Sequence, residues 1–195
     1  MVSSALPLPH SLAGRMLLAM PGMPDPRFDR AVVAMCVHDA DGALGIGLDT
    51  ELDGLTLHGL LEDLEIAPGA APDCPVLYGG PVEPGRGFVV HSAEWHGEGT
   101  LIVGDEGAPL WALTGSRDVL RAIAGGHGPA QWVVALGYAG WGAGQLDGEM
   151  RRHGWYAADG HFDIALAAEP EARWSRLWHA EGIDPALLAP ETGRA

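Results

Sequence analysis

Cys36 and His38 are the two residues of this chain whose types and spacing could support covalent chemistry. A cysteine thiolate beside an imidazolium is the usual arrangement of a nucleophile or a redox sensor. Residues two apart on a strand point to the same face, which places these two side chains about 6 to 7 Å apart. The alternative is that Cys36 is buried as a small apolar side chain while His38 begins a turn, and the sequence favours this alternative.

A glycine-rich segment at 137–144 is a candidate for binding rather than for reaction. It lies between an expected strand and an expected helix, where backbone N–H groups can bind an anion. Its glycine spacing does not match a dinucleotide-binding fingerprint, and the chain contains no lysine, which excludes phosphate-loop and Schiff-base lysines. We therefore favour tight turns that let Tyr138 and Trp141 pack against neighbouring side chains.

Two arginines stand beside positions that shape the backbone. Arg86 follows a turn rich in glycine and proline, and Arg117 follows Ser116, a potential N-cap. Structural salt bridges with Asp25 and Asp118 are the favoured interpretation, and an anionic ligand held between the arginines is the alternative. The residues predicted to bind a ligand, if their loops converge on one pocket, are Tyr78, Gly79, Gly80, Arg86, Ser116, Arg117, Tyr138 and Trp141.

Composition disfavours several classes of function. The formal net charge is -15 and every one of the 11 basic residues is arginine, so the chain repels phosphate backbones and direct nucleic-acid binding is not expected. None of the nine histidines has a metal-binding spacing, so we predict neither a metal nor a cofactor. No apolar run approaches the ~20 residues of a membrane span. The two cysteines are consistent with a reducing cytoplasm.

The elements that must position these residues follow from apolar spacing and turn residues. The loop at 21–26, which contains three prolines, can be neither helix nor central strand and must be an ordered or functional loop. A turn is expected at 138–142. Strands are expected at 16–20, 31–38, 43–49, 75–78, 87–91, 101–103, 110–113 and 131–137. Helices are expected near 57–64, at 117–123 and 145–153, and from Pro170 to Gly182.

These elements predict a single domain over residues 1–195, with a core at about 16–184 and tails at 1–15 and 185–195. Strands outnumber helices and alternate with them only late in the chain. The predicted fold class is therefore α+β rather than a doubly wound sheet.

Five motifs in one order resemble the YqgE/AlgH family of bacterial proteins. The resemblance covers about residues 17–183, and its motifs are Leu18-Ala19-Met20-Pro21 with Asp25-Pro26 and Phe28, Cys36-Val37-His38 with Gly42-Ala43-Leu44-Gly45, Tyr78-Gly79-Gly80-Pro81 with Arg86-Gly87-Phe88, Ser116-Arg117-Asp118-Val119-Leu120, and Ala135-Leu136-Gly137-Tyr138-Ala139-Gly140-Trp141 with Gly144-Gln145-Leu146. The chain departs from the family pattern at 48–51, at Val37 and at Asp39.

The resemblance implies a mixed β-sheet, partly curled into a small barrel and flanked by helices. It assigns no biochemical activity, although one namesake is associated with transcription-level control of exopolysaccharide production. We therefore predict a cytoplasmic, non-enzymatic regulatory or interaction protein that works through a protein partner or a small ligand. The alternative is a thiol-based redox sensor or enzyme that uses Cys36 with His38.

Overall fold

The computed structural model describes residues 11–23, 25–105, 107–152 and 154–188. The strands are β1 Met16–Ala19, β2 Val32–His38, β3 Gly42–Gly47, β4 Glu51–Thr56, β5 Pro75–Tyr78, β6 Val82–His91, β7 Thr100–Asp105, β8 Ala108–Thr114, β9 Trp132–Gly142 and β10 Trp155–Ala158. The helices are α1 Leu57–Asp63, α2 Arg117–Ala124, α3 Gln145–Arg151, α4 Phe162–Ala167 and α5 Pro170–Ala180, with 3-10 turns at Pro26–Phe28 and Pro185–Leu187. No helix in the described ranges has both the length and the apolar character that crossing a bilayer requires.

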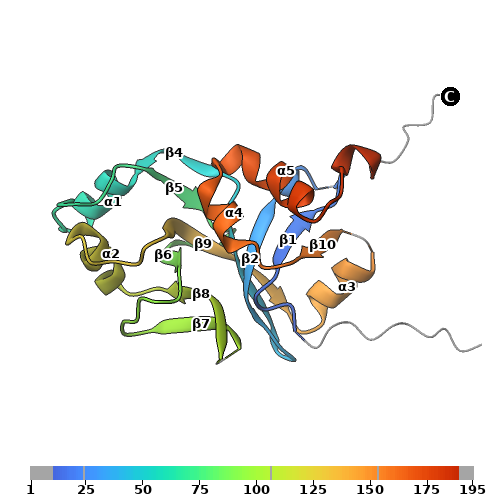
Figure 1. The fold of residues 1–195 in the computed structure, drawn as a ribbon, viewed down its shortest axis with the longest axis horizontal. Coiled ribbons are helices and arrows are strands. Elements are labelled where there is room, and N and C mark those ends of the chain that lie inside the picture. Colours follow the sequence, from blue (N-terminus) through green and yellow to red (C-terminus); the bar gives the residue numbers. More distant parts are fainter. Residues whose placement is uncertain (1–10, 24, 106, 153, 189–195) are drawn as a thin grey trace, which may run out of the picture.

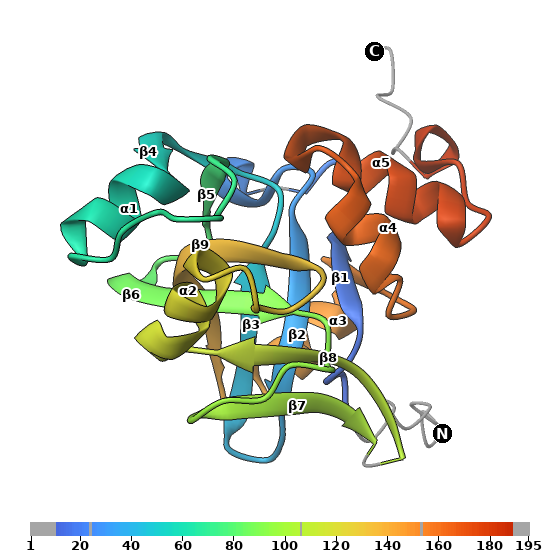
Figure 2. The same ribbon diagram turned by 60° about the vertical axis from the view of Figure 1, so that its left-hand side comes forward.

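The strands form one sheet in the order β10-β1-β2-β3-β9-β6-β8-β7, with β5 beside β9 and β4 beside β5. Every pair is antiparallel except β5 and β9, which run parallel. The mixed α+β fold is therefore confirmed. Because the described order ends at β10 and at β7, the sheet is not closed into a barrel. Figures 1 and 2 show how it instead curves around the middle of the molecule.

Strand β9 joins the two halves of the sheet. Its C-terminal part, residues 139–142, pairs with β3, whereas residues 132–138 pair with β6 and residues 135–136 with β5. The predicted turn at 138–142 is therefore wrong, because the strand continues to Gly142. Gly137 has φ of +74°, a conformation open to glycine, so the chain changes direction there without leaving the sheet.

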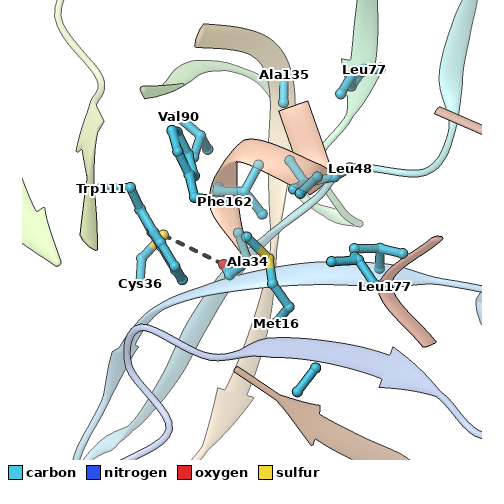
Figure 3. Packing of buried hydrophobic residues seen from close by; sticks show 14 of the residues in the cluster. Met16, Ala34, Cys36, Leu48, Leu77, Val90, Trp111, Ala135, Phe162 and Leu177 are labelled. Atoms are coloured by element: carbon cyan, nitrogen blue, oxygen red, sulfur yellow. Dashed lines mark hydrogen bonds between the residues drawn. The ribbon is translucent and has the colours of Figure 1, made fainter. Parts of the chain in front are cut away.

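Three apolar clusters hold the sheet and helices together. The inner core combines side chains from strands in both parts of the sheet with side chains of α4 and α5. Figure 3 shows part of it, which includes Met16, Cys36, Leu48, Leu77, Val90, Trp111, Phe162 and Leu177. The helical core packs α1 and α2 on β5, β6 and β9, and it includes Leu57, Leu61, Val76, Val89, Leu120 and Val134. The outer core packs α3 on β1, β2 and β9, and it includes Leu12, Leu17, Met35, Trp141, Leu146 and Trp155.

The helices cover different parts of this sheet. Figure 1 shows α1 and α2 at one end of the molecule and α3 at the other, and both ribbon views place α4 and α5 beside β1. The sequence did not predict β4, β10 or α4. It also assigns Leu12 to a tail, but this residue is only 3% exposed, so the packed chain begins before Met16.

Candidate functional site

Cys36 and His38 do not share a face of β2. The register between β2 and β3 shifts between Met35 and Val37, which makes Cys36 the extra residue of a β-bulge. The alternation of side chains is displaced by one residue after the bulge. The prediction that the side chains of Cys36 and His38 point to the same face is therefore wrong. His38 instead accepts a hydrogen bond from the backbone N–H of Leu12 at 3.0 Å, beside the outer core.

The thiol of Cys36 lies in the inner core. Figure 3 shows its Sγ directed to the carbonyl oxygen of Ala34, to which it donates at 3.5 Å. Burial raises the pKa of this thiol to about 12, because a thiolate there would lose its hydration without gaining a cation. Cys36 is thus a protonated thiol of the interior, with the burial that the favoured interpretation of the sequence expects.

The segment 78–80 meets the turn of β9 at a crossing where only glycine fits. The N–H of Gly79 donates to the carbonyl of Leu136 at 2.8 Å, and the N–H of Gly47 donates to the carbonyl of Gly79, also at 2.8 Å. A Cβ atom on Gly80 would overlap the backbone of Tyr138, and one on Gly137 would overlap the carbonyl of Gly80. These glycines therefore let two backbones cross closely, and a small cavity of about 30 Å³ remains beside them.

The arginines pair differently from the prediction. Arg86 donates to Glu83 at 3.0 Å and lies over the ring of Phe88, with its Cζ atom 5.0 Å from the ring centroid. The two carboxylates predicted as partners of these arginines instead form ion pairs with arginines two or three residues later in the chain. Asp25 pairs with Arg27 and Asp118 pairs with Arg121.

A hollow of about 160 Å³ opens between α1, the start of α2 and the strands β6 and β9. Its walls are mainly apolar side chains of the helical core, and three glycines at its edge leave the space unfilled. The lining residues are Leu60, Leu64, Gly85, Gly87, Phe88, Val89, Thr114, Gly115, Ser116, Arg117, Leu120, Val134 and Leu136. Two of the residues predicted to bind a ligand, Ser116 and Arg117, thus lie together on its rim.

The start of α2 carries polar groups that the described residues do not satisfy. Ser116 occupies the N-cap position, but its hydroxyl accepts no hydrogen bond from the first turn of the helix. Its Oγ atom exposes less than 1 Å² and has no hydrogen-bond partner among the described residues. Arg117 is exposed, and no carboxylate of the described residues lies within 4 Å of its guanidinium. The rim of the hollow therefore carries one uncompensated positive charge.

A hydrogen-bonded chain of buried groups runs beside the hollow. Nδ1 of His91 lies 2.9 Å from the carbonyl of Ser92 and must donate to it, which leaves Nε2 to accept from the hydroxyl of Thr114 at 2.9 Å. The Thr114 hydroxyl is in turn 2.8 Å from that of Thr100. Burial lowers the pKa of His91, so the neutral ring required by this arrangement is the stable form.

Trp141, another predicted site residue, is anchored in the outer core. Its indole N–H donates to the carboxylate of Glu149 at 3.0 Å, and the indole of Trp155 donates to the same oxygen atom at 2.9 Å. The two rings pack edge to face with centroids 6.3 Å apart. This carboxylate therefore fixes α3 against β9 and β10.

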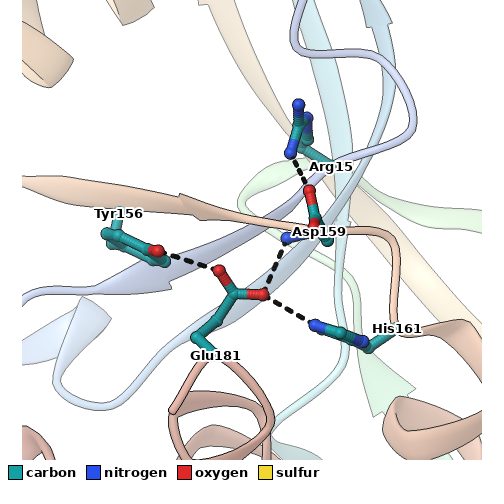
Figure 4. Close-up of polar contacts among 5 residues, drawn as sticks. All are labelled: Arg15, Tyr156, Asp159, His161 and Glu181. Carbon is teal, nitrogen blue, oxygen red and sulfur yellow. Dashed lines mark hydrogen bonds and ion pairs between the residues drawn. The ribbon is translucent and has the colours of Figure 1, made fainter. Parts of the chain in front are cut away.

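A second carboxylate organises the end of α5. Figure 4 shows Glu181 accepting from the Tyr156 hydroxyl at 2.8 Å and from the backbone N–H of Asp159 at 3.1 Å, and contacting Nε2 of His161 at 2.6 Å. Arg15 completes the group through an ion pair with Asp159. These contacts tie β10 and α4 to α5.

The structure does not bring the eight predicted ligand-binding residues to one pocket. Seven of them occupy three places: the glycine crossing at 78–80 with Tyr138, the hollow with Ser116 and Arg117, and the outer core with Trp141. Tyr138 and Trp141 also line one open hollow beside the hairpin of β2 and β3. Arg86 lies between Gly85 and Gly87 on the strand that borders the hollow. The α1 side of the hollow was missed, because leucines at helical spacing give the same signal whether they fill a core or line a cavity.

Comparison with known proteins shows the family to which the chain belongs. A family model described as AlgH-like matches residues 16–186. The chain belongs to the AlgH-like family. A UPF0301 protein of Novosphingobium aromaticivorans is 61% identical over 184 residues, which cover 94% of this chain and 97% of that protein. A UPF0301 protein of Rhizorhabdus wittichii is 58% identical over 187 residues, which cover 96% of this chain and 98% of that protein.

Solved structures agree with this assignment to the AlgH-like family. The solution structure of the AlgH protein from Pseudomonas aeruginosa matches with a TM-score of 0.75 and 35% identity, over the whole of both chains. A crystal structure of a protein from Corynebacterium diphtheriae matches with a TM-score of 0.72 at 17% identity, which supports the fold alone. The names of these relatives describe a family and assign no activity.

Proposed function

We propose that this AlgH-like protein is a non-enzymatic regulator that works in the cytoplasm by binding a small ligand in the hollow between α1 and α2. The observation that carries the proposal is the hollow itself. It is already open in the structure, apolar side chains form much of its wall, and its rim carries Arg117, which has no ion-pair partner among the described residues. Concave apolar sites with few convergent polar groups are the usual form of small-molecule sites.

The surroundings of Cys36 and His38 and the net charge of the chain are also consistent with a non-enzymatic regulator. The thiol of Cys36 is protonated and buried, and the bulge in β2 turns His38 away from it. A thiol-based enzyme or sensor needs the opposite, an accessible thiolate beside its activating base. The net charge of -15 disfavours direct contact with DNA, so an effect on transcription would pass through a protein partner.

Complementation of a deletion strain tests the proposal, with the transcript profile as readout. Gly87→Leu fills the hollow, because a Cβ atom at Gly87 has only Leu136 within 4 Å, at 3.7 Å. We expect this variant to fold and to leave the profile of the deletion strain unchanged. Gly107→Leu adds the same side chain where no atom lies within 4 Å of a new Cβ, and it should restore the wild-type profile.

Cys36→Ser separates this proposal from the thiol alternative in the same strains. A ligand-binding regulator needs no thiolate, so Cys36→Ser should restore the wild-type profile. Loss of complementation by a folded Cys36→Ser protein, together with full activity of Gly87→Leu, would overturn the proposal.

A further inference from the structure

We infer that the ligand of the hollow is a small monocarboxylate with an apolar body, an inference that rests on the proposed function. The charge of the rim sets the ligand's charge. Arg86 is neutralised by Glu83 at 3.0 Å, and Arg121 by Asp118 at 2.8 Å. Among the described residues, the charge of Arg117 is the one left without a partner at this rim, and none of the residues that line the hollow is acidic. A ligand with one negative charge completes this balance.

The start of α2 provides further groups for the carboxylate. The helix is eight residues long, and the side chain of its N-cap residue, Ser116, accepts no hydrogen bond from the N–H groups of the first turn. These N–H groups carry the positive end of the helix dipole, and the helix start that bears them, at Ser116 and Arg117, lines the hollow. The buried Oγ atom of Ser116, which has no partner in the described chain, is the third polar group at this point. A carboxylate is a planar acceptor that suits a guanidinium and adjacent N–H groups.

The walls and the volume set the rest of the ligand. The apolar lining comes from Leu60 and Leu64 of α1, Leu120 of α2, and Val134 and Leu136 of β9, with Phe88 and Val89 of β6. A volume of about 160 Å³ is close to that of the ~150 Å³ cavities that hold benzene in a protein interior. A six-membered ring or a branched chain of similar size therefore fits, whereas a nucleotide is too large.

Benzoate and benzamide are the matched probes for this inference, because they have the same size and shape and differ in charge. Each is titrated into uniformly ¹⁵N-labelled full-length protein at constant ionic strength, and the amide shifts of residues 115–120 are followed. We expect benzoate to bind on the order of tenfold more tightly than benzamide, since one charge-assisted contact separates them. Arg117→Gln should remove this preference, and Gly87→Leu should abolish the shifts from both probes.

The possible outcomes separate the ligand class from the proposed function. Equal affinities for benzoate and benzamide, with shifts at α2 that Gly87→Leu abolishes, would overturn the carboxylate and retain the hollow as a binding site. An unchanged preference for benzoate in Arg117→Gln would also overturn the inference. If neither probe moves the α2 amides, the monocarboxylate is excluded, and complementation by Gly87→Leu then decides the proposed function.

Discussion

The ring of Trp111 stacks on the ring of Phe162, with centroids 5.8 Å apart and planes inclined by 13°. Trp111 belongs to β8, near one end of the sheet order, and Phe162 begins α4, just after β10 at the other end. Both side chains are buried. This contact therefore joins the two ends of an open sheet through side chains rather than through backbone hydrogen bonds.

Phe162→Ala should lower the free energy of unfolding by about 3–5 kcal/mol, because it removes a buried ring and leaves a cavity against Trp111. Urea denaturation followed by far-UV circular dichroism measures the loss. Phe28→Ala is the control, since Phe28 is only partly buried and packs edge to face against Trp155. An equal loss of unfolding free energy in the two variants would show that the stack of Trp111 on Phe162 stabilises the protein no more than a partly buried aromatic contact does.

Gly137→Ala and Gly54→Ala separate backbone conformation from crowding. Both glycines have φ of +74°, so each substitution pays the same conformational cost of about 1–2 kcal/mol. A Cβ atom at Gly54 has no neighbour within 4 Å, whereas one at Gly137 meets the backbone of Gly80. We expect Gly137→Ala to cost about 1–3 kcal/mol more than Gly54→Ala in thermal unfolding. Equal costs would show that the strand crossing is not tightly packed.

Cys36 should resist thiol reagents while the protein is folded. With a pKa of about 12, the thiolate fraction at pH 8 is about 10⁻⁴, and burial blocks the reagent as well. The measurement uses Cys74→Ser, in which Cys36 is the remaining thiol, and Ellman's reagent. We expect slow labelling in buffer and complete labelling in urea. Rapid stoichiometric labelling of the native variant would restore the thiol hypothesis.

His91 should make stability depend on pH just below neutrality. Burial lowers the pKa of His91 below its ordinary 6.5, so below that pH the unfolded chain takes up a proton that the folded protein resists. The contribution is fully present above pH 6.5 and is lost as the pH falls, at no more than about 1.4 kcal/mol per pH unit.

His91→Asn removes this titration and retains a side-chain donor for the carbonyl of Ser92. Unfolding free energies of both proteins between pH 7.5 and 5.5 should therefore converge as the pH falls. Parallel curves would show that another group is responsible.

Local sequence signals predicted much of the fold. The hairpin of β2 and β3 follows from two apolar runs around 39–42, and α2 follows from Ser116 and Asp118 before an apolar stripe. Strand β4 was missed because Asp53 and Gly54 are poor strand residues. It exists only because β5, which lies about 20 residues later in the chain, pairs with it.

The site was less predictable, for a physical reason. Ser116 and Arg117 stand out in the sequence because a capping residue and a charge are recognisable alone. The cavity beside them is produced by the distance at which α1 and α2 pack over glycines of β6, and no local pattern encodes that distance. The bulge at Cys36 shows the same limit, because one additional residue in a strand reverses the direction of every side chain after it.

Strand β9 also sets an order of events during synthesis. Its partners β3, β5 and β6 all leave the ribosome before Trp132 does, and each has an edge that only β9 satisfies. A nascent chain that stalls before this point carries three strand edges without their β9 partner, together with apolar residues of the inner, helical and outer cores. Unpaired edges and exposed apolar surface favour aggregation, so synthesis of β9 closes the interval in which this chain is exposed to it.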